Sequence, residues 1–83
     1  MAFDQERLNT RGRLADAEQT ARSLEMRIHA LADSIRQALP AFADPEEFEA
    51  EKASALAIEL AGLHAEFVGL KQKIRAMRRA LGM

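Results

Sequence analysis

Apolar residues recur at alternating spacings of three and four along two long stretches of this 83-residue chain. In the first stretch, nine successive positions of this spacing are apolar: Leu14, Ala17, Ala21, Leu24, Ile28, Leu31, Ile35, Ala38 and Phe42. The second stretch holds nine more: Ala53, Leu56, Leu60, Leu63, Phe67, Leu70, Ile74, Met77 and Leu81. We call these positions the seam. A 3-4 spacing held over about four heptads is typical of helices that pack as a coiled coil.

Both prolines lie between the two stretches, at positions 40 and 45. Pro40 removes a backbone donor and restricts the residue before it, so the first helix is expected to end near Leu39. The run Asp44-Pro45-Glu46-Glu47 has the order of an N-cap and the first three helical positions, and its last Glu can complete a capping box. The sequence therefore predicts one domain with three segments: helix 4–39, loop 40–44 and helix 45–81.

The outer ends of the two helices also carry boundary signals. Asp4 is expected to be the N-cap of the first helix, which would place Phe3 and Leu8 at the spacing of a hydrophobic staple. Gly82 is expected to end the second helix, since glycine adopts the left-handed conformation that closes many helices.

The two helices are predicted to pair in an antiparallel hairpin. If residues whose numbers sum to 84 face each other, the six seam positions from Leu14 to Leu31 each meet a seam position of the second helix. In this register Leu24 meets Leu60, Ala21 meets Leu63 and Ala17 meets Phe67, so small residues face large ones. A core of constant width is filled in this way. The expected fold class is therefore all-α, an antiparallel two-helix coiled-coil hairpin.

The second helix has another apolar face outside the seam. It is expected to form a dimer interface, because glycine at an exposed helix position costs about 1 kcal/mol relative to alanine unless a close approach requires it. The interface residues are expected to be Ala55, Ile58, Ala61, Gly62, Ala65, Val68 and Gly69. An antiparallel homodimer about a two-fold axis near residues 61 and 62 would place the second helices at the centre of a four-helix bundle. The alternative is that both glycines are tolerated surface residues of an alanine-rich helix.

Charges are separated along the chain although the formal net charge is only −1. Residues 44–51 carry five acids and no base, whereas residues 70–83 carry five bases and no acid. In the expected dimer, the acidic end of each hairpin lies against the basic end of the other. A second possibility is a solvated basic end with no partner. The residues expected to bind an anionic partner are Arg11, Arg13, Lys71, Lys73, Arg75, Arg78 and Arg79.

The sequence offers little catalytic chemistry. There is no Cys, which excludes disulfides and thiolate nucleophiles, and the two histidines, His29 and His64, lie on different helices without metal-ligand spacing. The acids of residues 44–51 are explained by helix capping and solubility. We expect no catalytic residue, no metal and no cofactor. The apolar runs are short, so we also expect no transmembrane segment and a cytoplasmic location.

Two functions fit these patterns. The first is a non-enzymatic structural or interaction protein, a self-associating hairpin that acts as adaptor, scaffold or modulator of a larger assembly. The alternative is a small accessory protein that binds nucleic acid through the basic open end of the hairpin. This alternative is not favoured, because the chain has no Trp or Tyr and no net positive charge.

Overall fold

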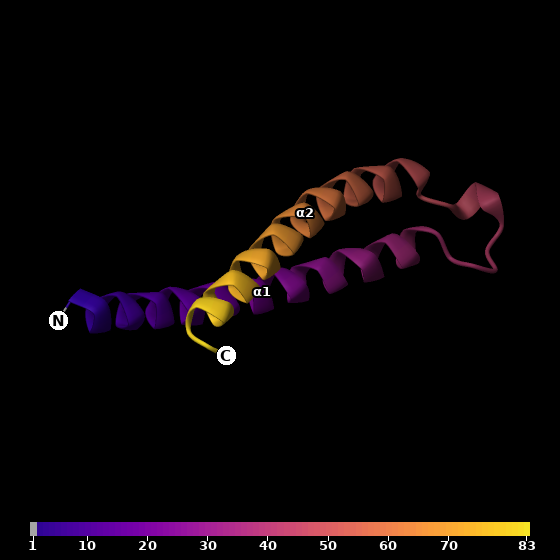
Figure 1. Ribbon diagram of the computed structural model, residues 1–83. Coiled ribbons are helices and arrows are strands. Elements are labelled where there is room, and N and C mark those ends of the chain that lie inside the picture. The colour runs from indigo at the N-terminus through magenta and orange to yellow at the C-terminus, as the bar shows by residue number, and fades with distance from the viewer. Residues whose placement is uncertain (1) are drawn as a thin grey trace.

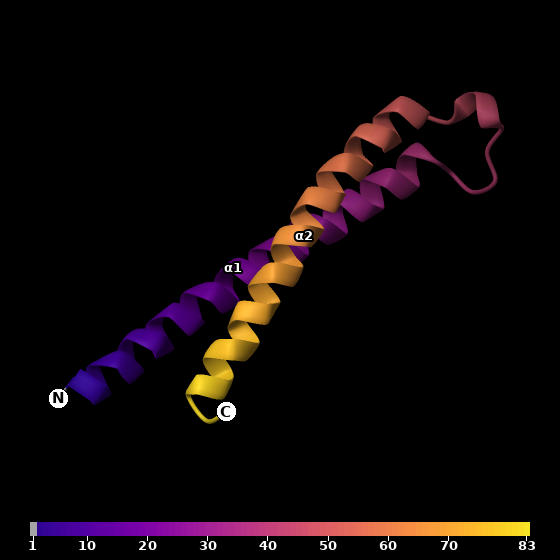
Figure 2. The same cartoon turned by 45° about the horizontal axis from the view of Figure 1, so that its top comes forward.

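A computed structural model describes residues 2–83, with side chains described from Asp4 onward. It contains helix α1 (Ala2–Ala38), the 3₁₀ turn η1 (Pro45–Glu47) and helix α2 (Ala50–Ala80). The two long helices pack against each other and run in opposite directions (Figure 1), so the prediction of an all-α antiparallel hairpin is confirmed. The molecule is a rod of 67 × 16 × 15 Å in which the helices cross at a shallow angle (Figure 2).

The core is a thin layer between the two helices, and every buried residue among those with described side chains belongs to the seam. Ile74 is the most deeply buried side chain, at 1% exposure. The other buried residues are Leu14, Ala21, Leu24, Ala38, Ala53, Leu63 and Leu81. The 3-4 spacing therefore identified the packed face of both helices, because residues three and four apart lie on one side of a helix.

The register between the helices differs from the predicted one. The guanidinium of Arg7 donates to the carbonyl oxygen of Leu81 at 3.5 Å, and the amide of Glu49 donates to the carbonyl oxygen of Ala38 at 2.9 Å. The residue numbers of these two pairs sum to 88 and 87. Paired positions thus sum to about 88, and the expectation of 84 is wrong by about one helical turn.

The cause of the shift is the connection between the helices. Asp44 does act as an N-cap, and its Oδ1 accepts from the amide of Glu46 at 3.0 Å, but it caps the short turn η1 and not α2. Phe48 then adopts an extended conformation, and α2 begins only at Ala50. The connection therefore spans residues 39–49 in place of the predicted loop 40–44. Its centre moves from residue 42 to residue 44, which changes the sum of paired numbers by four.

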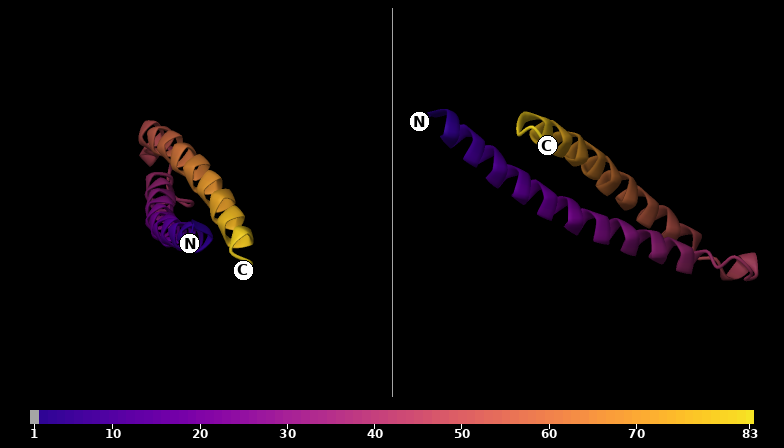
Figure 3. Two further views of the ribbon diagram at one scale, coloured as in Figure 1. Left: turned by 60° about the vertical axis from the view of Figure 1, so that its left-hand side comes forward. Right: turned by 60° about the horizontal axis from the view of Figure 1, so that its bottom comes forward.

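The outer ends of the hairpin confirm one boundary prediction and correct another. Gly82 has φ of 75°, its amide donates to Arg79 and the amide of Met83 donates to Arg78, which together form a Schellman motif. At the other end, α1 begins at Ala2, so Asp4 lies inside the first turn and is not the N-cap. The predicted staple involves Phe3, whose side chain lies outside the described residues. The N-terminal turns of α1 extend beyond the end of α2 (Figure 3).

Candidate interaction surfaces

The apolar face of α2 that the sequence assigned to a dimer interface is open in the hairpin. We call it the outer face and define it by Ala55, Ile58, Ala61, Gly62, Ala65, Val68 and Gly69. Ile58 is 74% exposed and Val68 is 42% exposed, and the small residues between them are also accessible. Only Gly69 is half-buried. The packing of α1 on α2 therefore leaves an apolar surface of large and small side chains facing solvent.

The two glycines of the outer face are not required by the hairpin itself. A Cβ atom added at Gly62 or Gly69 would meet no heavy atom within 4 Å among the described residues. Alanine at these positions would favour the helix by about 1 kcal/mol each, so an isolated hairpin would be more stable without the glycines. Close approach of another backbone is a physical reason to keep them.

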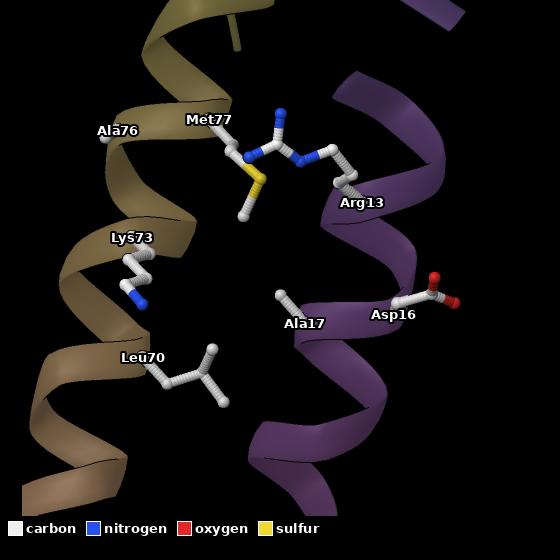
Figure 4. A pocket seen from close by; sticks show the side chains of 7 residues that line it. All are labelled: Arg13, Asp16, Ala17, Leu70, Lys73, Ala76 and Met77. Carbon is white, nitrogen blue, oxygen red and sulfur yellow. The ribbon is translucent and has the colours of Figure 1, made fainter. Parts of the chain in front are cut away.

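A groove runs along one side of the hairpin, between α1 and α2. It has a volume of about 530 Å³ and is lined by Arg13, Asp16, Ala17, Leu70, Lys73, Ala76 and Met77. Figure 4 shows Ala17 and Leu70 facing each other across the gap, with the side chain of Arg13 extending towards Met77. Asp16 points away from the gap in this view. The groove thus has an apolar floor and a cationic side chain on each helix.

The same side of the hairpin carries a second hollow that continues this groove. It has a volume of about 370 Å³ and shares Leu70 and Lys73 with the first. Its wall on α2 includes Ala65 and Gly69, which belong to the outer face. The groove and the outer face therefore meet along one edge of α2. The sequence analysis missed this groove because its lining depends on the register between the helices.

The seven basic residues predicted to form one anion-binding end lie in different local environments. Only Arg13 and Lys73 line the groove together. Arg78 forms an ion pair with Glu18 at 2.9 Å, and Lys71 lies over the ring of Phe67, 6.0 Å from its centroid. Arg11 lines a separate hollow of about 250 Å³ near the N-terminus.

Two further basic residues, Arg75 and Arg79, are exposed on α2. Because Arg75 is two residues from Lys73, the two side chains leave the helix on different faces. The structure therefore brings two of the seven predicted basic residues to one groove and does not join all seven in a single patch.

The connection at the other end of the hairpin is both acidic and apolar. We call residues 42–51 the hairpin tip. It carries five acidic side chains, all between Asp44 and Glu51, and no basic side chain. Phe42 is fully exposed and Phe48 is 37% exposed. Glu49 lies 3.4 Å from Lys52. Among the described residues, this is the one ion pair that involves an acid of the tip.

The structure also shows where the two histidines and the acidic groups lie. His29 is 4.0 Å from Glu25 on the same helix, and His64 is exposed on α2. Within residues 2–83, no group of three or more His, Asp and Glu residues is arranged to hold a metal ion.

One helix within the described residues is long and apolar enough to cross a membrane by length and composition. This helix is α2, in which an 18-residue window has a mean hydropathy of 1.3 and is 11% buried. Core helices of water-soluble proteins have the same length and composition. The low burial reflects the apolar surface of α2 that α1 does not cover.

Comparison of the chain with protein-family models, with curated proteins and with solved structures finds no match in any of the three. The functional argument therefore rests on the surfaces described above.

Proposed function

We propose that this protein is a non-enzymatic interaction protein, a hairpin that associates with a second copy of itself and acts as adaptor, scaffold or modulator of a larger assembly. The observation that carries the proposal is the open outer face of α2, where Ile58 and Val68 are exposed beside small residues. An exposed apolar surface on a helix that is already packed on one side favours a partner on the other side.

A second copy fits this face because the face is self-complementary. When two α2 helices lie antiparallel about a two-fold axis near residues 61 and 62, residues whose numbers sum to about 123 meet. Ala61 then faces Gly62, and Ile58 faces Ala65, so each large side chain meets a small one. Two helices can approach closely where glycine and alanine form the contact, which explains the glycines that the hairpin does not need. The expected assembly has four helices, with the two α2 helices at its centre.

The charges of the hairpin support the antiparallel direction. The same operation brings the acidic hairpin tip of one copy beside the basic residues 70–79 of the other. Exposed ion pairs contribute only about 0–1 kcal/mol each, so they set orientation and the apolar contact supplies most of the affinity.

The proposal is tested by sedimentation of two matched variants, Gly62→Glu and Gly12→Glu. Both glycines are exposed and neither has a neighbour within 4 Å of an added Cβ atom, but only Gly62 lies on the outer face. We expect the unmutated protein and Gly12→Glu to sediment as dimers of about twice 9.2 kDa, and Gly62→Glu to sediment as a monomer. A monomeric unmutated protein at tens of micromolar, or equal loss of the dimer in both variants, would contradict the proposal.

A further inference from the structure

The groove between α1 and α2 has the chemistry of a receptor for an acidic segment with an apolar side chain. Its floor is formed by Ala17, Leu70 and Met77, and its cations are Arg13 from α1 and Lys73 from α2 (Figure 4). A purely anionic ligand would leave the floor uncovered, and a purely apolar one would bury the two cations without partners, which is costly. The occupant needs both features.

The hairpin tip of the same protein has both features. Phe48 is 37% exposed in the extended segment between η1 and α2. It directly follows Glu46 and Glu47, whose side chains form no capping hydrogen bond in the described part of the chain. Neither of these two glutamates forms an ion pair within the described part of the chain. The tip cannot reach the groove of its own hairpin, because it lies at the opposite end of the rod from the N-terminal part of α1 and the C-terminal part of α2 (Figure 1).

The antiparallel dimer places the tip of one copy at the level of the groove of the other. With paired numbers that sum to about 123, Ala50 at the start of α2 lies beside Lys73 of the partner helix, and the tip that precedes Ala50 continues towards Met77 of the partner. The α2 wall of the groove consists of residues between Leu70 and Met77. The groove also adjoins the outer face, since the hollow that continues it is lined by Ala65 and Gly69.

We infer that the groove of each hairpin receives the tip of a second copy, with Phe48 on the apolar floor and Glu46 and Glu47 beside Arg13 and Lys73. The inference rests on the proposed self-association through α2 and names the second contact of that assembly. Because the dimer is two-fold symmetric, the contact occurs twice, and it fixes the direction of the two hairpins.

A charge exchange between groove and tip tests the contact. One variant carries Arg13→Glu with Lys73→Glu, and the other carries Glu46→Lys with Glu47→Lys. Each variant alone would place like charges beside each other at both contacts. We therefore expect the dissociation constant of its dimer to rise by about tenfold or more. An equimolar mixture should recover the unmutated affinity. In the mixed dimer, an acidic groove meets a basic tip at one contact and the original pair meets at the other.

The matched control is Arg22→Glu with Arg27→Glu. It makes the same change in net charge on exposed positions of α1 that do not line the groove, and we expect the unmutated affinity. Circular dichroism of every variant confirms that the hairpin is folded. Equal weakening in this control, or a mixture that associates no better than its components, would overturn the inference.

The aromatic part of the contact is tested by Phe48→Ser, with Phe42→Ser as its comparison. Phe42 is the more exposed of the two, but it lies beyond the level of the groove in the dimer. We expect weaker association, by about tenfold, for Phe48→Ser and little change for Phe42→Ser, since one apolar side chain contributes about 1.5–3 kcal/mol when buried. A larger loss of association for Phe42→Ser than for Phe48→Ser would contradict the assignment of Phe48 to the groove.

These outcomes separate the inference from the proposed function. If Gly62→Glu abolishes the dimer while the groove and tip variants retain full affinity, self-association through α2 stands and the groove contact is wrong. If the unmutated protein is a monomer, both are wrong.

Discussion

Ile74 and Ile58 lie on the same helix but differ in burial. Ile74 points into the seam and is almost completely buried, whereas Ile58 points away from α1 into solvent. The two residues have the same side chain and the same helix propensity. The difference in stability lost when each is replaced with Ala therefore measures what packing against α1 contributes to the free energy of unfolding.

Replacing Ile74 with Ala should therefore lower the free energy of unfolding strongly. Loss of a buried Ile side chain costs about 2–5 kcal/mol, and this core is thin. Ile58→Ala should change the unfolding of the dilute hairpin by no more than about 0.5 kcal/mol, as expected for an exposed position. Thermal melts followed by circular dichroism at low protein concentration make the comparison. Equal losses of stability would mean that the seam does not carry the core.

At the scale of the helices, the seam was predictable and the register was not. The 3-4 spacing depends only on helix geometry, so it identified the eight residues that are buried in the described part of the chain. The register depends on the connection, where the sequence Asp44-Pro45-Glu46-Glu47 fits the start of an α-helix and of a 3₁₀ turn equally well. A shift of three to four residues again brings seam positions opposite seam positions, with sums of 88 for Leu14 and Ile74 and 87 for Ala17 and Leu70. The hydrophobic pattern alone therefore does not distinguish the two registers.

This difference in predictability extends to the candidate surfaces. The outer face lies on a single helix, so the sequence could identify it. The groove is built from both helices, and its pairing of Arg13 with Lys73 follows only from the observed register.

The register can be measured by cysteine cross-linking, because the chain has no native cysteine. Ala21 and Phe67, whose numbers sum to 88, pack in one cluster of the core. We expect the double variant Ala21→Cys, Phe67→Cys to form an intramolecular disulfide readily. Ala21→Cys with Leu63→Cys tests the register of 84, and a displacement of one turn, about 5.4 Å, should prevent the bond. Faster oxidation of the second variant would contradict the observed register.

At the scale of the whole molecule, the rod separates an acidic tip from a basic open end. This separation suits a second copy in the antiparallel direction better than it suits nucleic acid. The basic residues point to different faces, and Arg78 is paired with Glu18. Phosphate binding needs several cations on one surface, and the chain has no Trp or Tyr to stack on bases.

We accordingly expect weak binding of duplex DNA or RNA at physiological salt. Fluorescence anisotropy of a labelled duplex measures it, and charge reversal at Lys71, Lys73 and Arg75 should remove whatever binding exists without unfolding the hairpin. Submicromolar binding by the unmutated protein would favour the nucleic-acid alternative instead.

The central claim is that α2 meets α2 of a second copy near residues 61 and 62, and single-cysteine cross-linking tests it most directly. The two-fold axis places the two copies of residue 61 next to each other, so oxidised Ala61→Cys should convert to a disulfide-linked dimer on a denaturing gel. Ala30→Cys, exposed on α1, is the matched control and should remain monomeric. A control variant that cross-links as fast as Ala61→Cys, or an Ala61→Cys protein that stays monomeric under oxidation, would contradict an assembly with α2 at its centre.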